Sequence, residues 1–270
     1  MSESAKPRSR FPAALHQVAP SATARAGTLR PQRPLHEAAD DARRHVAPTG
    51  LGLDGDAARV RMVMRLQQEG VRCEPVLQAL RAVQRHGFVD TALAAQAYED
   101  TSLPIGLGQT ISKPSVVARM LEWLFLGESA RARGHLGRVL EIGTGCGYQA
   151  ALLAEVSSHV VSIERLRPLH DMAHQRLSAL GTPRCRLLHG DGMLGSPSHG
   201  PFDSIISAAG GEELPEAWLD QLAVGGRLIA PALAAGGRHQ VLVVVDRTAQ
   251  GLRRTIGETV QFVPLKSGFT

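Results

Sequence analysis

The stretch VLEIGTGCGYQAALLAEV, residues 139–156, decides the fold. An apolar run ends in three alternating glycines, Gly143, Gly145 and Gly147, and apolar residues then continue at helical spacing. A short strand, a glycine turn and a helix in this order are typical of an open α/β sheet, which binds ligands at the carboxyl ends of its strands. The stretch therefore predicts a strand–turn–helix unit whose glycines hold a ligand.

The chain on both sides of this stretch continues the pattern. Upstream, apolar spacing predicts helices at 59–70, 74–89 and 115–127, with a loop over 101–114 that is rich in Gly, Pro and small polar residues. Downstream, strands are expected at 138–143, 159–165, 185–192, 202–210, 227–232 and 239–248, and helices at 147–156, 167–180 and 214–226. This alternation predicts an α/β fold with a mostly parallel sheet covered on both faces and an antiparallel finish.

Composition limits the classes of protein to consider. The 270 residues are 43% hydrophobic, which suits an ordinary globular core, and no apolar run reaches the roughly 18–20 residues that a membrane span needs. Neither a secretory signal nor a membrane partner is expected. The three cysteines form no CxxC pair, and a reducing compartment, by default the cytoplasm, is expected.

The N-terminal part of the chain differs from the rest. Residues 1–57 hold six prolines and no sustained period, which predicts a disordered extension before a single domain at 58–270. Residues 1–50 carry eight Lys or Arg against four Asp or Glu, so they account for +4 of the net charge of +5. Because the rest of the chain is nearly neutral, no nucleic-acid partner is expected.

The glycine spacing discriminates between ligands. A dinucleotide fingerprint, G-x-G-x-x-G, would need a glycine where Tyr148 stands, and no Gly-Lys-Ser or Gly-Lys-Thr of a phosphate-binding loop follows. The pattern E-x-G-x-G-x-G instead resembles the first motif of S-adenosylmethionine-dependent methyltransferases. The resemblance implies that the cofactor S-adenosyl-L-methionine, and its product S-adenosyl-L-homocysteine, bind at Glu141, Gly143, Thr144, Gly145, Gly147 and Tyr148.

Two later acids complete this cofactor site. Glu164 ends the next strand, 21 residues after Gly143, where a carboxylate can accept both ribose hydroxyl protons. Gly190, Asp191 and Gly192 close the third strand, where the acid can accept from the adenine amino group and the glycines let the ring lie flat. The alternatives are that Glu164 is a solvated charge and that Asp191 is only a turn residue.

The absence of several motifs narrows the range of possible methyl acceptors. Methylation of amino groups typically uses an Asn/Asp-Pro-Pro-aromatic run after the fourth strand, and this chain has Ser-Ala-Ala-Gly-Gly at 207–211. Cytosine C5 chemistry needs an activated cysteine, whereas Cys146 in the glycine loop is expected to be a packing residue. His170 and His174 lie four residues apart on one helix, a face expected to be solvated, and no metal is expected.

The loop LPIGLGQTISKP, residues 103–114, adds the most specific signal. Together with GYQ at 147–149, HGDG at 189–192 and FVPL at 262–265, it resembles the protein-L-isoaspartate O-methyltransferase family from about Arg59 onwards. The resemblance implies a doubly wound seven-stranded sheet and, as substrates, isoaspartyl residues in damaged proteins. Two departures, Gly210-Gly211 in place of common prolines and Gln261 in place of a common arginine, bear on how substrate is positioned.

The family match assigns roles to the loop. Ser112 matches the family's active-site serine, and its neighbour Thr110 is the second catalytic candidate. The acceptor, a main-chain carboxylate with a pKa of roughly 3.5–4, is already ionised at neutral pH, so the hydroxyls are expected to orient it and not to attack. The alternative is that Ser112 only caps the helix that starts near Pro114. Substrate contacts are expected at Leu103, Pro104, Ile105, Val263, Pro264 and Leu265.

Three functional hypotheses follow from these observations. The first is methyl esterification of isoaspartyl residues, which initiates their repair. The second is a methyltransferase that acts on small carboxylic acids with the same donor. The third is a module that binds S-adenosylmethionine without catalysis. Methylation of small acids would favour the second hypothesis, and donor binding without turnover would favour the third.

Overall fold

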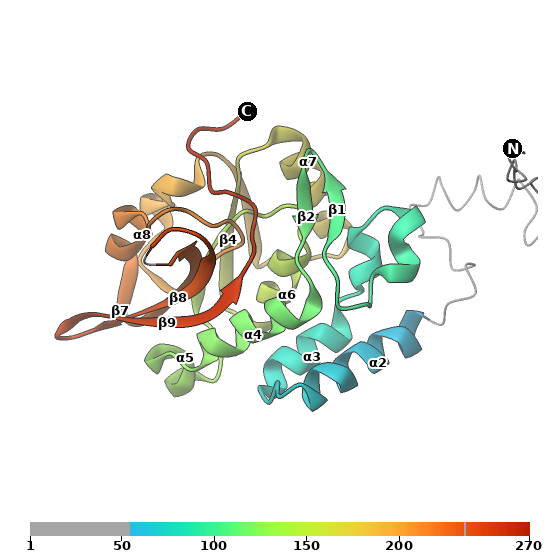
Figure 1. Ribbon diagram of the computed structural model, residues 1–270, viewed down its shortest axis with the longest axis horizontal. Coiled ribbons are helices and arrows are strands. Elements are labelled where there is room, and N and C mark those ends of the chain that lie inside the picture. The colour runs from blue at the N-terminus through green and yellow to red at the C-terminus, as the bar shows by residue number, and fades with distance from the viewer. Residues whose placement is uncertain (1–54, 235) are drawn as a thin grey trace, which may run out of the picture. The chain divides into compact units, whose positions relative to one another are not determined.

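The computed structural model describes residues 55–234 and 236–270 (Figure 1). The described residues belong to one compact unit. The extension predicted for 1–57 lies outside the described residues, except that residues 55–57 form the first residues of helix α2 (Gly55–Gln68).

A seven-stranded sheet forms the centre of this unit. Its strands follow the order β5-β4-β3-β6-β7-β8-β9. The first five are parallel neighbours, and β8 pairs antiparallel with both β7 and β9. The bounds are β3 (Arg138–Ile142), β4 (His159–Glu164), β5 (Cys185–His189), β6 (Phe202–Ser207), β7 (Leu222–Leu233), β8 (Gln240–Thr248) and β9 (Gly251–Val260). The predicted fold class, a doubly wound and mostly parallel sheet, is confirmed.

Helices cover the sheet because its parallel strands are apolar on both faces. One hydrophobic cluster joins α2, α3, α4 and α6 to the sheet, and a second lies between the opposite face and α8. In Figure 1 the first group of helices lies together below the sheet. After α2, the helices are α3 (Glu74–Ala82), α4 (Pro114–Phe125), α5 (Glu128–Arg133), α6 (Tyr148–Val156), α7 (Arg167–Ala179) and α8 (Glu216–Asp220). The 3-10 turns are η2 (Arg85–Phe88), η3 (Thr91–Gln96), η4 (Gly192–Leu194) and η5 (Pro197–His199).

The segment expected to be a loop at 101–114 contains a β-hairpin. Strands β1 (Leu103–Gly106) and β2 (Gln109–Ile111) pair antiparallel, with Leu103 opposite Ile111. The reversal uses three consecutive positive φ angles, 94° at Gly106, 53° at Leu107 and 69° at Gly108. Glycine adopts such angles without steric cost, so the Gly-x-Gly spacing makes a tight turn where the sequence indicated only irregular structure.

The predicted helix at 214–226 is also wrong in its length. Helix α8 ends at Asp220, and Leu222 already pairs with Phe202 of β6. Gly225 has a φ of 82°, outside the helical range, and the β-branched Val224 fits a strand better than a helix. Strand β9, which the sequence did not reveal, then adds an edge whose outer residues are exposed.

Candidate active site

A cavity of about 740 Å³ lies at the carboxyl ends of the parallel strands. Four segments form most of its wall: the β1–β2 hairpin with Ser112, the β3–α6 loop, the β4–α7 connection and residues 263–266. Twelve of the eighteen predicted site residues line it: Ile105, Thr110, Ser112, Gly143, Thr144, Gly145, Tyr148, Glu164, Gly192, Val263, Pro264 and Leu265. The other six, Leu103, Pro104, Glu141, Gly147, Gly190 and Asp191, lie outside this wall.

The glycine turn and the hairpin meet directly. Gly143 and Gly145 have φ angles of 86° and 56°, and a Cβ added to Gly145 would lie 3.2 Å from Cδ1 of Ile105. Because that separation is tighter than an ordinary contact, a side chain at Gly145 would push the tip of Ile105 aside and would also be strained by the positive φ. The glycine thus brings the predicted cofactor loop against the loop that carries Ser112.

Glu164 is buried and fixed at the cavity wall. Its Oε2 accepts a hydrogen bond from Gly145 N at 2.8 Å, and its Oε1 accepts one from Leu166 N at 2.9 Å. The side chain is 5% exposed, so the solvated-charge alternative is wrong. A carboxylate has about four acceptor positions, and two backbone donors therefore leave capacity for hydroxyl groups of a ligand.

Glu141 and Gly147 support the glycine turn from behind. Glu141 is fully buried and accepts a hydrogen bond from the Ser162 hydroxyl, and burial raises its pKa to about 8. Gly147 precedes α6 with a φ of 92°, and a Cβ there would lie 3.4 Å from Ala173 and Leu177 of α7. Both residues thus set the packing of the turn, and a direct contact with cofactor stays a prediction.

Tyr148 lies in the cavity wall, but its ring is buried. The ring makes an edge contact with Phe88, at 5.5 Å between centroids, and the Arg85 guanidinium lies 4.9 Å from its centroid. Burial raises the pKa of the phenol to about 12. The tyrosine thus anchors α6 against the N-terminal helices, which explains why a large residue follows the third glycine.

Asp191 acts as a turn residue in this structure. Its Oδ1 accepts from Met193 N at 2.8 Å, which caps η4, and its Oδ2 accepts from Gly268 N at 2.6 Å. Gly192 lines the cavity, and a Cβ there would lie only 2.6 Å from Ile142. Asp191 thus stabilises the turn, which is compatible with either interpretation, and its predicted contact with adenine, and that of Gly190, stay predictions.

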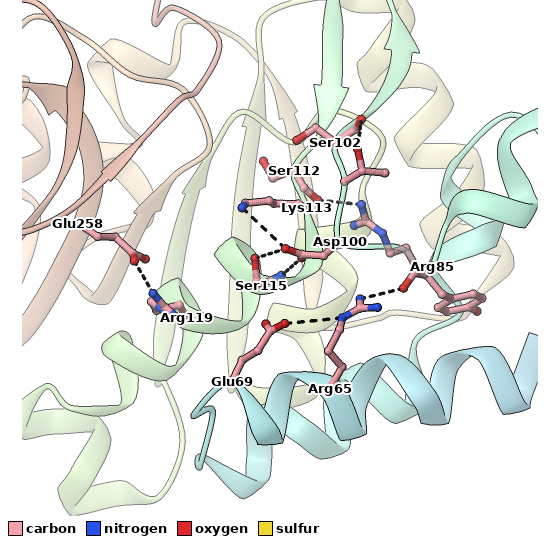
Figure 2. Close-up of polar contacts among 12 residues, drawn as sticks. Arg65, Glu69, Arg85, Asp100, Ser102, Ser112, Lys113, Ser115, Arg119 and Glu258 are labelled. Atoms are coloured by element: carbon pink, nitrogen blue, oxygen red, sulfur yellow. Dashed lines mark hydrogen bonds and ion pairs between the residues drawn. The ribbon is translucent and has the colours of Figure 1, made fainter.

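Ser112 and Thr110 both face the cavity, and neither hydroxyl makes a hydrogen bond within the described ranges. The alternative that Ser112 caps α4 is wrong, because the N-cap position is Lys113 and has no side-chain cap. Asp100 instead satisfies the first turn of α4: its carboxylate accepts hydrogen bonds from the Ser115 N–H and hydroxyl, at 2.8 Å each (Figure 2). The Ser112 hydroxyl thus stays available to a ligand.

Residues 262–265 are held beside the hairpin by the Gly210 backbone. Gly210 N donates to Val263 O at 2.9 Å, and Leu265 N donates to Gly210 O at 2.8 Å. A Cβ at Gly210 would lie 2.5 Å from the Gln240 amide, whose Oε1 accepts from Phe262 N at 2.7 Å. This crowding explains the departure at Gly210. On the hairpin, Leu103 is buried in the core and Pro104 is exposed.

Sequence reasoning missed residues that act on the cavity from a distance. Arg85, Asp100 and Gln240 each bond to the backbone of a catalytic or substrate segment, and no local pattern marks them. Gln149 was visible in the GYQ motif. The residue lines the cavity, and its buried Nε2 makes no hydrogen bond with the described residues.

The structure also bears on the cysteine nucleophile and the metal site that the sequence disfavours. Cys146 is buried, and desolvation raises the pKa of its thiol, which opposes a thiolate nucleophile. The His170 face is only partly solvated, because its ring stacks on His174 at 6.3 Å. Within residues 55–234 and 236–270, no group of three or more His, Cys, Asp or Glu could hold a metal ion.

Comparisons with known proteins agree with this site. The family model for protein-L-isoaspartate(D-aspartate) O-methyltransferase matches residues 57–270. The chain is 58% identical to a protein-L-isoaspartate O-methyltransferase of Methylibium petroleiphilum, with 99% of each chain covered. It is 53% identical to one of Leptothrix cholodnii, covering 99% of this chain and 98% of the relative.

Two solved structures share the fold. A protein-L-isoaspartate O-methyltransferase aligns with a TM-score of 0.69 and 29% identity, covering 78% of this chain and 67% of that one. A Plasmodium falciparum protein described as a β-aspartate methyltransferase, in complex with S-adenosyl-L-homocysteine, aligns with a TM-score of 0.64 and 25% identity, covering 76% and 97%. From its residues, its cavity and these relatives, the chain belongs to the protein-L-isoaspartate(D-aspartate) O-methyltransferase family.

Proposed function

We propose that this cavity methylates the free main-chain carboxylate of L-isoaspartyl residues in damaged proteins, with S-adenosyl-L-methionine as donor. One observation carries the proposal: the unbonded Ser112 hydroxyl, the Gly143–Gly145 turn and Ile105 of the hairpin line a single cavity, and a Cβ added to Gly145 would meet Ile105. A donor held by the turn and an acceptor held by the hairpin can therefore meet.

The residues present fit the donor. A volume of about 740 Å³ is within the roughly 300–1,000 Å³ of small-molecule sites, and the wall is mainly apolar with few polar groups. Glu164 offers a fixed acceptor for ribose hydroxyls, while Gln149 offers a buried amide donor without a partner among the described residues. The bound donor supplies an electrophilic methyl group on a sulfonium.

The protein's task is then placement. An isoaspartyl carboxylate is ionised at neutral pH, so it needs no general base and must instead lose water from one oxygen and be held in line. Ser112 and Thr110 can donate to the other oxygen, because neither hydroxyl is occupied within the described chain. The fully buried Glu141 takes no part in proton transfer, because it lies outside the cavity wall.

The acceptor peptide is proposed to lie between the hairpin and residues 263–265. Both segments line the cavity, and Pro104 at the hairpin edge and Pro264 are exposed. An extended peptide can use such edges for main-chain contacts and shallow apolar contacts. Isoaspartyl proteins, and not only small acids, would then reach the catalytic hydroxyls.

The compartment is part of the same proposal. In the part of the chain that the structure describes, no helix is long and apolar enough to cross a membrane. Cys73, Cys146 and Cys185 are all free thiols. Free thiols persist in reducing compartments, and we place the reaction in the cytoplasm on that ground.

Labelled methyl transfer to two peptides that differ only in isoaspartate versus aspartate tests the activity. The isoaspartyl peptide is expected to be methylated and the aspartyl peptide to stay unlabelled. Equal labelling of both, or efficient labelling of small carboxylic acids, would contradict the proposed acceptor. Binding of the donor without any labelling would leave a non-catalytic binding module.

Ser112→Ala tests the role of the hydroxyl. Loss of one hydrogen bond to a charged group costs about 1.5–3 kcal/mol, so kcat/KM for the isoaspartyl peptide is expected to fall about 10- to 100-fold. Binding of S-adenosyl-L-homocysteine, measured by calorimetry, should stay unchanged. Ser102→Ala is the matched control, because Ser102 is exposed beside the hairpin and outside the cavity wall. Equal loss of methylation and binding in Ser112→Ala would refute the orienting role.

A further inference from the structure

Arg85 is a fully buried cation directly behind the acceptor loop. It is 0% exposed, and its Nη2 donates to the Ser112 carbonyl at 2.8 Å (Figure 2). Its Nε donates to Ala97 O at 2.7 Å. The guanidinium also lies 4.9 Å from the centroid of the Tyr148 ring. Ser112 and Tyr148 both line the cavity, so one layer of residues separates Arg85 from it.

In the described part of the chain no carboxylate forms an ion pair with this guanidinium, although Asp100 favours its charged form without contacting it. Within the described ranges no carboxylate lies within 4 Å of the Arg85 nitrogens, and its buried Nη1 makes no hydrogen bond. Asp100 is not an ion-pair partner of Arg85: it accepts hydrogen bonds from Ser115 and lies 3.7 Å from Lys113 Nζ. Burying an unpaired charge is costly, and arginine stays protonated in proteins, so a positive charge persists at this place.

The incoming acceptor carries the opposite charge. This step rests on the proposed function, in which the acceptor is a carboxylate held at Ser112. Charges that attract each other weakly in water interact several times more strongly in a buried site. An arginine behind the loop can therefore favour the carboxylate over a neutral group of the same shape.

We propose that Arg85 is a positioning residue for the acceptor, which fixes the Ser112 turn through its carbonyl and supplies a positive charge without an ion-pair partner behind the acceptor carboxylate. Two functions are combined in one side chain because the planar guanidinium donates in several directions at once. A lysine in its place would keep the charge but could not hold both carbonyls in this geometry.

A pair of peptides separates the charge from the structural role. The enzyme loaded with S-adenosyl-L-homocysteine is titrated with an isoaspartyl peptide and with the same peptide whose main-chain carboxylate is converted to a neutral amide. Wild type is expected to bind the carboxylate peptide at least tenfold more tightly. In Arg85→Gln this preference is expected to shrink at least fivefold, because the enzyme charge and the ligand charge are coupled.

Two further variants complete the design. Arg85→Lys is expected to keep the preference for the carboxylate but to lower kcat, since the Ser112 carbonyl loses its rigid donor. Arg65→Gln is the matched control: Arg65 donates to Tyr98 O at 3.0 Å and lies 3.9 Å from Glu69, yet it does not contact Ser112. That variant should change neither the preference nor kcat.

The outcomes separate the proposals. Equal weakening of both peptides in Arg85→Gln, or no preference in wild type, overturns the role of the charge. If Arg85→Gln does not fold, as judged by its melt and by its binding of S-adenosyl-L-homocysteine, Arg85→Lys decides: a lost preference or an unchanged kcat overturns the proposal. Wild type that methylates no isoaspartyl peptide overturns the proposed function as well, which the peptide-labelling assay reveals independently.

Discussion

Two buried carboxylates near the glycine turn differ in the groups that reach them. Glu164 accepts from two backbone N–H groups, of Gly145 and Leu166, and lies in the cavity wall. Glu141 lies in the neighbouring strand and is fully buried, with a hydrogen bond from Ser162 as its support. Residues of the same type therefore take different roles: Glu164 can serve a ligand, whereas Glu141 supports the fold.

Glu141→Gln tests that distinction through the pH dependence of stability. Burial raises the pKa of Glu141 to about 8, although the hydrogen bond from Ser162 lowers it, and the nearby Glu164 carboxylate raises it further. A raised pKa means that its contribution to stability is complete below the unfolded value of 4.5 and is lost as the pH rises through about 8. Glutamine cannot ionise, so wild type should lose stability relative to the variant by up to about 1.4 kcal/mol per pH unit in this window.

Urea unfolding of both proteins at intervals from pH 5 to 9 measures the difference. Glu155→Gln is the control, because Glu155 is exposed on α6 and should follow wild type throughout. Parallel stability curves for wild type and Glu141→Gln would show that Glu141 is ionised in the folded protein at neutral pH.

At the scale of elements, residues 262–265 depend on Gly210, because the Gln240 side chain occupies the space that a larger residue would need. Gly210→Ala would place a Cβ 2.5 Å from the Gln240 amide nitrogen and would press on the bond from Phe262 N to Gln240 Oε1. Overpacking of this kind costs about 1–3 kcal/mol. We expect a lower melting temperature and a raised KM for the isoaspartyl peptide, with binding of S-adenosyl-L-homocysteine little changed.

A second substitution shows whether the clash is the cause. Gln240→Ser added to Gly210→Ala should recover part of the lost stability, because it removes the colliding amide; additive losses would exclude this explanation. Gly87→Ala is the control, since a Cβ at Gly87 meets nothing within 4 Å and the residue has no positive φ.

An element can be predicted from the sequence when residues close to it in the chain determine it, and not when contacts with distant residues do. Helix α4 and strands β3 and β4 follow from apolar spacing and from Pro114 in the first turn. The end of α8 does not, because the pairing of Leu222 with Phe202 decides it across the sheet. In the site, the Gly143 turn and Ser112 were predicted together, whereas Arg85 was not: its partner Ser112 lies 27 residues away, and no periodicity records such a bond.

At the scale of the whole molecule, the residues of the cavity and most of the net positive charge lie in different parts of the chain. Residues 1–50 carry +4, which leaves +1 for residues 51–270, where 22 Lys or Arg face 21 Asp or Glu. The two hydrophobic clusters and the cavity consist of residues from Met62 onwards. Binding to a generic polyanion and methyl transfer should therefore be separable.

A chain beginning at Leu51 tests this separation. It should methylate the isoaspartyl peptide with a kcat/KM within about twofold of the full chain, because every wall residue of the cavity is retained. Its retention on a heparin column should fall, since attraction to a polyanion follows the lost positive charge and is screened by salt. The comparison needs both proteins at one ionic strength. A large fall in kcat/KM with an unchanged melting temperature would instead assign the extension a direct part in binding the acceptor protein.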